Sequence, residues 1–263
     1  MNFKNLKLDI SNQGIVSVLF SNPKTKNAFN PNMILEIKKA LKFFEKSNQC
    51  RVLILSGEGD TFSSGADLIW MKKSKNLSYN QNKKESKAFT EMLKAIDFFP
   101  KPIVSIVNGN AFGGALGIIA ASDFALSVKE SNFCFSEVKL GLVPAMIAPY
   151  VIRTIGYKAS KKLFLTGEVF NSEKALNIGL IDDIVNLKDF NLNSSQLLKN
   201  LINSAPIAQN KIKSFLKKIY YKEIDNIVIN QTTDTISKIR ITREAQEGLS
   251  AFLEKRKPSW SKK

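Results

Sequence analysis

Three observations predict an α/β fold with parallel strand pairing. Between residues 51 and 128, strand-like apolar runs alternate with helical patterns, which is typical of parallel sheets connected through helices. Two glycine-rich turns each lead from such a strand into the helix that follows it. The chain has 263 residues, 44% of them hydrophobic, so it is long enough to bury a sizeable core and has a globular composition.

The N-terminal half is predicted to begin with a β-hairpin and then to alternate helices and strands. Residues 6–10 and 15–20 alternate apolar and polar side chains around a polar turn, as expected of a hairpin. Asn30 and Pro31 predict a helix start, because Asn is a favoured N-cap and Pro a favoured first residue. The further predicted elements are strands at 51–55, 103–107 and 124–128, helices at 31–44, 68–72 (capped by Asp67), 85–98 and 114–121, and a polar, mobile surface segment at 74–84.

After residue 145 the pattern becomes mainly helical. The predicted elements are helices at 145–155, 158–165, 172–177, 194–203, 206–221 and 225–255, and a short strand at 180–185. We expect a core domain over 1–195 and a C-terminal helical region over 196–263. Apolar side chains of the last helix, such as Ile236 and Phe252, have few neighbours left in the sequence to cover them. We expect them to pack on another region or another subunit.

The composition excludes several kinds of chemistry. The chain has no histidine, so Ser-His-Asp catalysis, Cys-His catalysis and His-ligated metals are ruled out. Cys50 and Cys134 form no CxxC pair, which leaves no support for a zinc site or a disulfide framework. We therefore expect no metal, and any acid-base chemistry must come from Asp, Glu, Lys, Tyr or Cys.

The charge and hydropathy patterns bear on partners and location. The formal net charge of +16 would attract anions, either for a functional reason or because of a general richness in lysine. No nucleic-acid-binding motif is present, so a nucleic-acid partner is not expected. No apolar run approaches the length of a membrane helix, and the first residues do not read as a signal peptide. We expect a cytoplasmic protein without a membrane partner.

The glycine-rich turns indicate where the chemistry lies. They are Ser64-Gly65-Ala66, after the strand at 51–55, and Gly113-Gly114-Ala115, after the strand at 103–107. The backbone N–H groups at the start of a helix are free to bind an oxyanion, so one N–H from each turn could hold a single carbonyl oxygen. Two structural turns without a ligand are the alternative. Neither a Walker A nor a GxGxxG sequence is present, which excludes nucleotide chemistry of those kinds.

Six segments in a fixed order resemble the crotonase superfamily, also called the enoyl-CoA hydratase/isomerase superfamily. They are KNAFN at 26–30, FSSGADL at 62–68, VNGNAFGGA at 107–115, SEVKLGLVP at 136–144, LTGE at 165–168 and EGLSAFLEKR at 247–256. The resemblance covers nearly the whole chain. It implies a crotonase fold of repeated ββα units, an acyl-CoA thioester substrate, a homotrimer or a dimer of trimers, and no cofactor, because coenzyme A is part of the substrate.

The resemblance also assigns roles to individual residues. The backbone N–H groups of Ala66 and Gly114 match the oxyanion hole, and Glu137 matches the second of the two catalytic glutamates of the hydratases. The first glutamate position falls on Gly117, a departure that would open space beside the reacting double bond. The remaining implied contacts are Ala28, Ala66 and Lys255 with coenzyme A, and Gly117, Trp70 and Met71 with the acyl group.

A single glutamate leaves the reaction type open. The segments at 67–72 and 143–151 are similar to the methylglutaconyl-CoA and isohexenylglutaconyl-CoA hydratase branch. We therefore predict hydration of a short branched 2-enoyl-CoA, with 3-methylglutaconyl-CoA from leucine breakdown as the expected substrate. Two alternatives remain: a Δ3-Δ2-enoyl-CoA isomerase that uses Glu137 alone, and a basic RNA-binding protein with a vestigial site.

Overall fold

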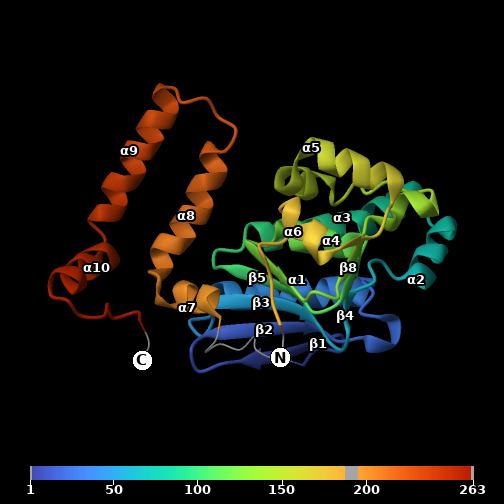
Figure 1. The fold of residues 1–263 in the computed structure, drawn as a ribbon, viewed down its shortest axis with the longest axis horizontal. Coiled ribbons are helices and arrows are strands. Elements are labelled where there is room, and N and C mark those ends of the chain that lie inside the picture. The colour runs from blue at the N-terminus through green and yellow to red at the C-terminus, as the bar shows by residue number, and fades with distance from the viewer. Residues whose placement is uncertain (1, 187–194, 262–263) are drawn as a thin grey trace.

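The computed structural model describes residues 2–186 and 195–261 and is built on a six-stranded main sheet (Figure 1). The strand order is β1-β2-β3-β5-β7-β10. β1 and β2 form the predicted antiparallel hairpin, and every later pairing in this sheet is parallel. The strands are β1 (Leu6–Ile10), β2 (Ile15–Phe20), β3 (Val52–Gly57), β5 (Ile103–Val107), β7 (Phe124–Ser127) and β10 (Asp183–Ile184).

A second sheet of four short strands was not predicted from the sequence. Its order is β4-β6-β8-β9, with strands β4 (Thr61–Ser63), β6 (Asn110–Phe112), β8 (Asn132–Cys134) and β9 (Phe170–Asn171). β4, β6 and β8 follow β3, β5 and β7 directly, so each repeat is a bent pair of strands. The bend requires glycine: a Cβ on Gly109 would lie 1.8 Å from the carbonyl oxygen of Asp60. The ββα units expected of the crotonase fold are confirmed.

Helices follow the bent strand pairs and cover the main sheet. They are α1 (Pro31–Lys46), α2 (Leu68–Lys73), α3 (Tyr79–Asp97) and α4 (Gly114–Ala121). The predicted N-caps are confirmed: the Asn30 side chain accepts from the Met33 N–H, and the Asp67 side chain accepts from two N–H groups of α2. The prediction of a mobile segment over 74–84 is wrong, because α3 begins at Tyr79 with a capping box between Ser78 and Gln81.

The later helices are α5 (Ala148–Thr166), α6 (Ser172–Asn177), α7 (Gln196–Asn203), α8 (Pro206–Ile219), α9 (Asn226–Arg240) and α10 (Arg243–Leu253). α5 bends at Gly156, whose φ of 75° separates the two helices predicted there. The single helix predicted over 225–255 is two helices, because the Thr242 side chain caps a new start at the Ala245 N–H. α9 and α10 extend away from the sheets (Figure 1). The predicted domain boundary at 195/196 adjoins residues outside the described range and stays a prediction.

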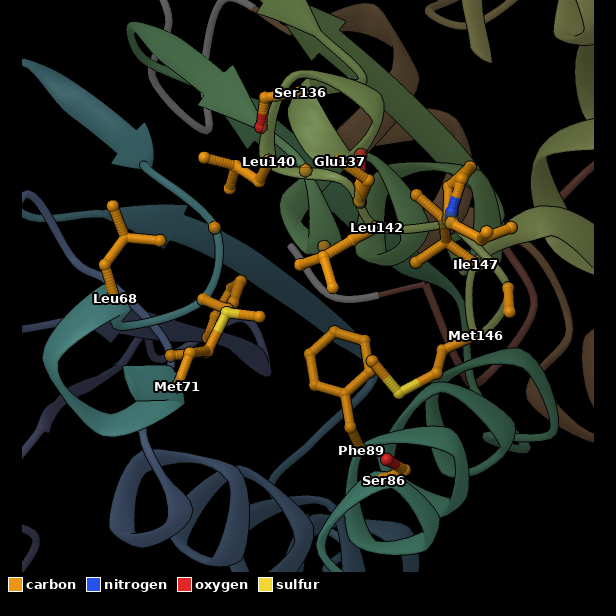
Figure 2. Close-up of a pocket in the computed structure, with 18 of the residues that line it drawn as sticks. Leu68, Met71, Ser86, Phe89, Ser136, Glu137, Leu140, Leu142, Met146 and Ile147 are labelled. Atoms are coloured by element: carbon orange, nitrogen blue, oxygen red, sulfur yellow. The ribbon is translucent and has the colours of Figure 1, made fainter. Parts of the chain in front are cut away.

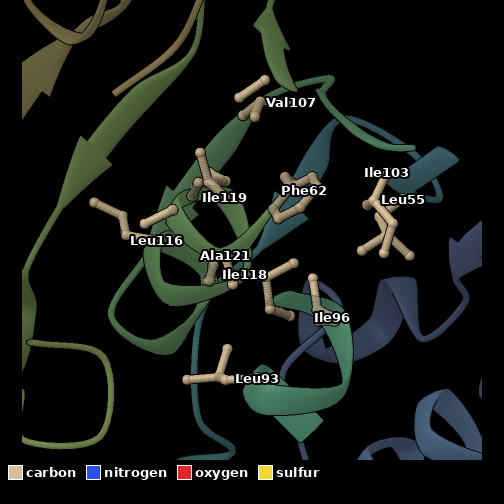
Figure 3. Close-up of a cluster of buried hydrophobic side chains, with 14 of the residues drawn as sticks. Leu55, Phe62, Leu93, Ile96, Ile103, Val107, Leu116, Ile118, Ile119 and Ala121 are labelled. Carbon is tan, nitrogen blue, oxygen red and sulfur yellow. The ribbon is translucent and has the colours of Figure 1, made fainter. Parts of the chain in front are cut away.

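The two faces of the main sheet bury different apolar clusters. Leu53 and Leu55 of β3 belong to the main core, together with side chains of α1, α3 and α4. Figure 3 shows Leu55 with Leu93, Ile96 and Ile118 in this core. Val52 and Ile54 alternate to the opposite face and pack with side chains of α7. Because helices cover both faces, the ends of β3 and β5 are held firmly, and the turns that follow them are fixed in position.

Candidate active site

A cavity of about 340 Å³ lies between α2, α3, the start of α4, the 3-10 helix η3 (Ser136–Leu140) and the loop before α5. Met71, Phe89 and Leu142 surround its central space (Figure 2). The volume is suited to a small ligand. The apolar part of the lining comprises Phe29, Leu68, Trp70, Met71, Phe89, Leu140, Leu142, Val143, Pro144, Ala145, Met146 and Ile147.

The two glycine-rich turns meet at this cavity. Gly65 has a φ of +90°, and a Cβ on it would lie 2.7 Å from the carbonyl oxygen of Phe112 and 3.6 Å from the Cα of Gly113. Only glycine permits both the backbone conformation and this approach. The close contact brings Ala66 and Gly114 to the wall of one cavity, as the sequence predicted.

The backbone N–H groups of Ala66 and Gly114 are available to a ligand. Phe29 pairs with Ala66 in an isolated parallel bridge, in which the Phe29 N–H donates to Gly65 and the Asp67 N–H donates to Phe29. The N–H of Ala66 therefore points to the side away from Phe29. Gly114 is the first residue of α4, so its N–H has no intrahelical acceptor. Two donors of this kind suit an oxygen that becomes negatively charged.

Glu137 places a carboxylate beside the two turns. It lies on η3, and a Cβ on Gly113 would be 3.4 Å from its Oε1. Its Oε2 is buried and has no hydrogen-bond partner among the described residues. Burial raises the pKa of the Glu137 carboxyl above the usual value of a glutamate. A carboxylate with a raised pKa and a free oxygen is well suited to accept and return a proton.

The prediction that Gly117 opens space in the site is wrong. Gly117 does not line the cavity, and a Cβ on it would lie 2.3 Å from Cγ2 of Ile147. Ile147 fills the position and itself lines the cavity. The wall at the position of the first family glutamate is therefore apolar and closed.

The other predicted contact residues divide into two groups. Trp70 and Met71 line the cavity, as predicted for the acyl pocket. Ala28 is buried directly before Phe29 but does not line the cavity. Lys255 lies just beyond α10, outside the lining, so within one chain the structure does not bring it to the site.

Several lining residues were not identified from the sequence. Phe89 is the most significant, because Cζ of its ring lies 2.9 Å from the point where a Cβ of Gly114 would be. The ring therefore forms a wall next to the oxyanion site. Its position on the apolar face of α3 predicts only a core residue. Glu85 and Ser86 lie near it on α3 and also line the cavity. The described lining contains two acids, Glu85 on α3 and Glu137 on η3, and no lysine or arginine.

Comparison with known proteins agrees with this geometry. The enoyl-CoA hydratase/isomerase family model matches residues 10–263. The chain belongs to the enoyl-CoA hydratase/isomerase family. The protein is accordingly an enzyme of hydro-lyase or isomerase type, and the crotonase resemblance of its motifs is confirmed at this level.

The relatives of this family member include hydratases and an isomerase. The crystal structure of an enoyl-CoA hydratase from Shewanella pealeana has a TM-score of 0.94 and 37% identity, and the match covers 98% of this chain and 97% of that one. A crotonyl-CoA hydratase of Syntrophomonas wolfei is 28% identical over 94% of this chain and 95% of its own. A trans-2-decenoyl-[acyl-carrier-protein] isomerase of Streptococcus mutans is 25% identical over the full length of both chains.

Among the described residues, no group of three or more cysteine or acidic side chains is arranged to hold a metal ion. In the same part of the chain, no helix combines the length and apolar character needed to cross a bilayer.

Proposed function

We propose that the enzyme adds water to a short, branched 2-enoyl-CoA, with Glu137 as its acid-base group. The observation that carries this proposal is the buried Oε2 of Glu137, which has no hydrogen-bond partner among the described residues, beside the backbone N–H groups of Ala66 and Gly114 at one cavity. The carbonyl oxygen of the thioester would accept hydrogen bonds from the N–H groups of Ala66 and Gly114. Both hydrogen bonds strengthen when the carbonyl oxygen becomes an enolate oxygen.

In the proposed hydration Glu137 acts twice. It takes a proton from a water molecule as the water oxygen forms its bond to C3. The electron pair of the C2–C3 double bond then forms the C1–C2 double bond of the enolate, and the pair of the carbonyl π bond moves onto the carbonyl oxygen. The enolate then collapses, and C2 takes the same proton from Glu137. One water is consumed, and the carboxylate is regenerated. The raised pKa favours the first step, because it makes the Glu137 carboxylate a stronger base toward water.

The closed wall at Gly117 favours a second candidate. With Ile147 in that place, Glu137 is the acid of the described lining with a contact at the Gly113 turn, and the other acid, Glu85, lies on α3. A Δ3-Δ2-enoyl-CoA isomerase needs only one base, which removes a proton at C2 and returns it at C4. Hydration by a single carboxylate also requires a well-placed water.

The lining bears on the acyl group. The apolar residues Met71, Phe89 and Met146 suit a short aliphatic chain. 3-Methylglutaconyl-CoA, the substrate predicted from the sequence, carries an additional carboxylate. The described lining offers that group hydroxyls such as those of Ser74 and Ser86 but no cation, and Glu85 would repel it. We therefore expect a neutral branched chain to react faster than the glutaconyl chain.

One experiment separates the candidates. The purified protein is offered crotonyl-CoA, 3-methylcrotonyl-CoA, 3-methylglutaconyl-CoA and a 3-enoyl-CoA in deuterated water, and the products are resolved by mass and by the position of the label. Hydration adds the mass of one water, whereas double-bond migration adds only exchanged deuterium. Rapid rearrangement of the 3-enoyl thioester without hydration of any 2-enoyl thioester would refute the hydratase and establish the isomerase.

A further inference from the structure

A lysine-rich segment contributes residues to the wall of the cavity. Residues 68–84 contain five lysines and no acidic residue. These five form what we call the lysine rim: Lys72 and Lys73 at the end of α2, Lys75 in the 3-10 helix η2 (Ser74–Asn76), and Lys83 and Lys84 in the first turns of α3.

The lysine rim directly adjoins the cavity-lining residues along the chain. Its members alternate along the chain with residues that line the cavity, namely Met71, Ser74, Asn82 and Glu85. All five lysines are exposed. Each of these cations therefore faces solvent within one or two residues of the cavity lining.

The charges of the rim lysines are not compensated by acids in the part of the chain that the structure describes. Over the described residues, none of the five has a carboxylate within ion-pair distance, whereas Lys87, one turn further along α3, pairs with Glu91 at 3.9 Å. Five uncompensated positive charges on a small area repel one another. Binding of an anionic partner would reduce this repulsion.

Apolar side chains lie among these charges. The side chains of Ile69 and Tyr79 are 75% and 76% exposed, and the Lys83 ammonium lies 5.8 Å from the centroid of the Tyr79 ring. Apolar and aromatic side chains within a charged border are the composition of a surface that contacts another protein. Coenzyme A carries phosphates and an adenine ring, so the test below compares it directly with a protein carrier.

We propose that the lysine rim docks an acidic protein that carries the acyl group on a phosphopantetheine arm. This inference rests on the proposed function, because the docked carrier must deliver the same 2-enoyl thioester to Ala66, Gly114 and Glu137. The thioester and the pantetheine portion of such an arm are those of coenzyme A. The carrier's acidic side chains would pair with the rim lysines, and Ile69 and Tyr79 would contact its apolar side chains.

The position of the rim in the fold agrees with a large partner. α2 and the first turns of α3 lie at the end of the molecule opposite α9 and α10 (Figure 1). The exposed apolar side chains of those C-terminal helices are thus far from the rim. A carrier at α2 and a second copy of the chain at α9 and α10 would occupy different surfaces.

The test uses one 2-enoyl group on three carriers: an acidic acyl carrier protein, coenzyme A and pantetheine alone. The rim variant is K75Q/K83Q/K84Q. The matched control is K39Q/K42Q/K46Q, which removes three exposed lysines of α1 that do not line the cavity. Turnover is measured as kcat/KM at low and high salt. Binding of the fluorescently labelled carrier is measured separately by anisotropy.

For the parent enzyme we expect kcat/KM on the carrier thioester to exceed that on the pantetheine thioester about tenfold or more at low salt, and the excess to shrink at high salt. In the rim variant this ratio of kcat/KM values should fall at least fivefold, and the carrier should bind more weakly. In the control variant the ratio and the affinity for the carrier should each change by less than twofold.

Three results would overturn the inference. The first is turnover of the free thioesters without any advantage of the carrier. The second is an equal loss for CoA and the carrier in the rim variant, which would assign the rim to the CoA phosphates. The third is rim-dependent binding of an RNA probe with unchanged carrier binding. Failure of catalysis on every thioester while the labelled carrier still binds the rim would refute the proposed function and leave the docking site in place.

Discussion

Cγ2 of Ile147 lies 2.3 Å from the point where a Cβ of residue 117 would be. Gly117 is on α4 and Ile147 directly precedes α5, so the absence of a side chain at 117 is what allows the two segments to approach. The contact converts the position of a family carboxylate into an apolar wall. It also couples the two residues, because neither can be changed without affecting the other.

Substitution G117A should therefore destabilise the protein. The added methyl group overpacks a closed contact, which costs about 1–3 kcal/mol in the free energy of unfolding. The second substitution I147A removes the opposing side chain, so the double variant G117A/I147A should lose less stability than the sum of the two single variants. Urea denaturation of all four proteins measures this coupling. Additive losses would contradict the contact.

Glu137 should show a trade between stability and activity. E137Q keeps the shape of the side chain but cannot accept a proton as a carboxylate, so turnover should fall by about two orders of magnitude or more. Thermal unfolding should give a Tm at neutral pH equal to or above that of the parent, because the substitution removes a buried, incompletely solvated charge. Activity within tenfold of the parent would refute the catalytic role.

The pH dependence provides a separate check on Glu137. Its folded-state pKa is raised by burial, so the folded protein holds a proton there at pH values where the unfolded chain has released it. Stability from this group therefore falls as the pH rises from the usual glutamate value through the raised one. The acid limb of kcat/KM should lie above the ordinary glutamate pKa. Across that pH window, the fall in the free energy of unfolding that comes from this group should be present in the parent and absent from E137Q.

The order of strands and helices could be predicted because most elements have a clear apolar period and recognisable caps. Asn30 and Asp67 are examples, and both cap the helices expected of them. The second sheet could not be predicted, since strands of two or three residues, such as β4 (Thr61–Ser63), are too short to show a period. The start at Tyr79 was missed because the first turns of α3 are polar and held by a capping box.

The site was predictable where it depends on short motifs and not where it depends on contacts between distant segments. The turns at Gly65 and Gly113, and the carboxylate of Glu137, lie in motifs that can be read along the chain. The contact between Gly117 and Ile147 joins residues thirty positions apart, so the sequence suggested open space where the structure has none. The apolar pattern of the sequence around Phe89 would be the same whether this side chain faced the core or a substrate.

The C-terminal helices predict assembly with further copies of the chain. Phe252 and Leu253 at the end of α10 are 82% and 79% exposed, and apolar side chains of this size are unfavourable in water. Light scattering should give a mass that is a multiple of the chain, with a trimer as the expected unit. Substitution F252S/L253S should shift the population toward the monomer, whereas a monomeric parent would contradict the prediction.

We predict that Lys255 joins that assembly to the active site of a neighbouring copy. It follows α10 directly and does not line the cavity of its own chain, so a contact with the phosphates of coenzyme A requires the cavity of another copy. K255E should then raise the KM for acyl-CoA and leave the reaction of a pantetheine thioester nearly unchanged. Co-expression of E137Q and K255E chains under two affinity tags isolates mixed oligomers. In a cyclic trimer of both chains, about one site in three combines an intact Glu137 with an intact Lys255 from its neighbour, so kcat/KM at low acyl-CoA should approach a third of the parent value. If Lys255 acts within its own chain, no mixed oligomer contains a complete site, and the activity would equal the average of the two pure variants.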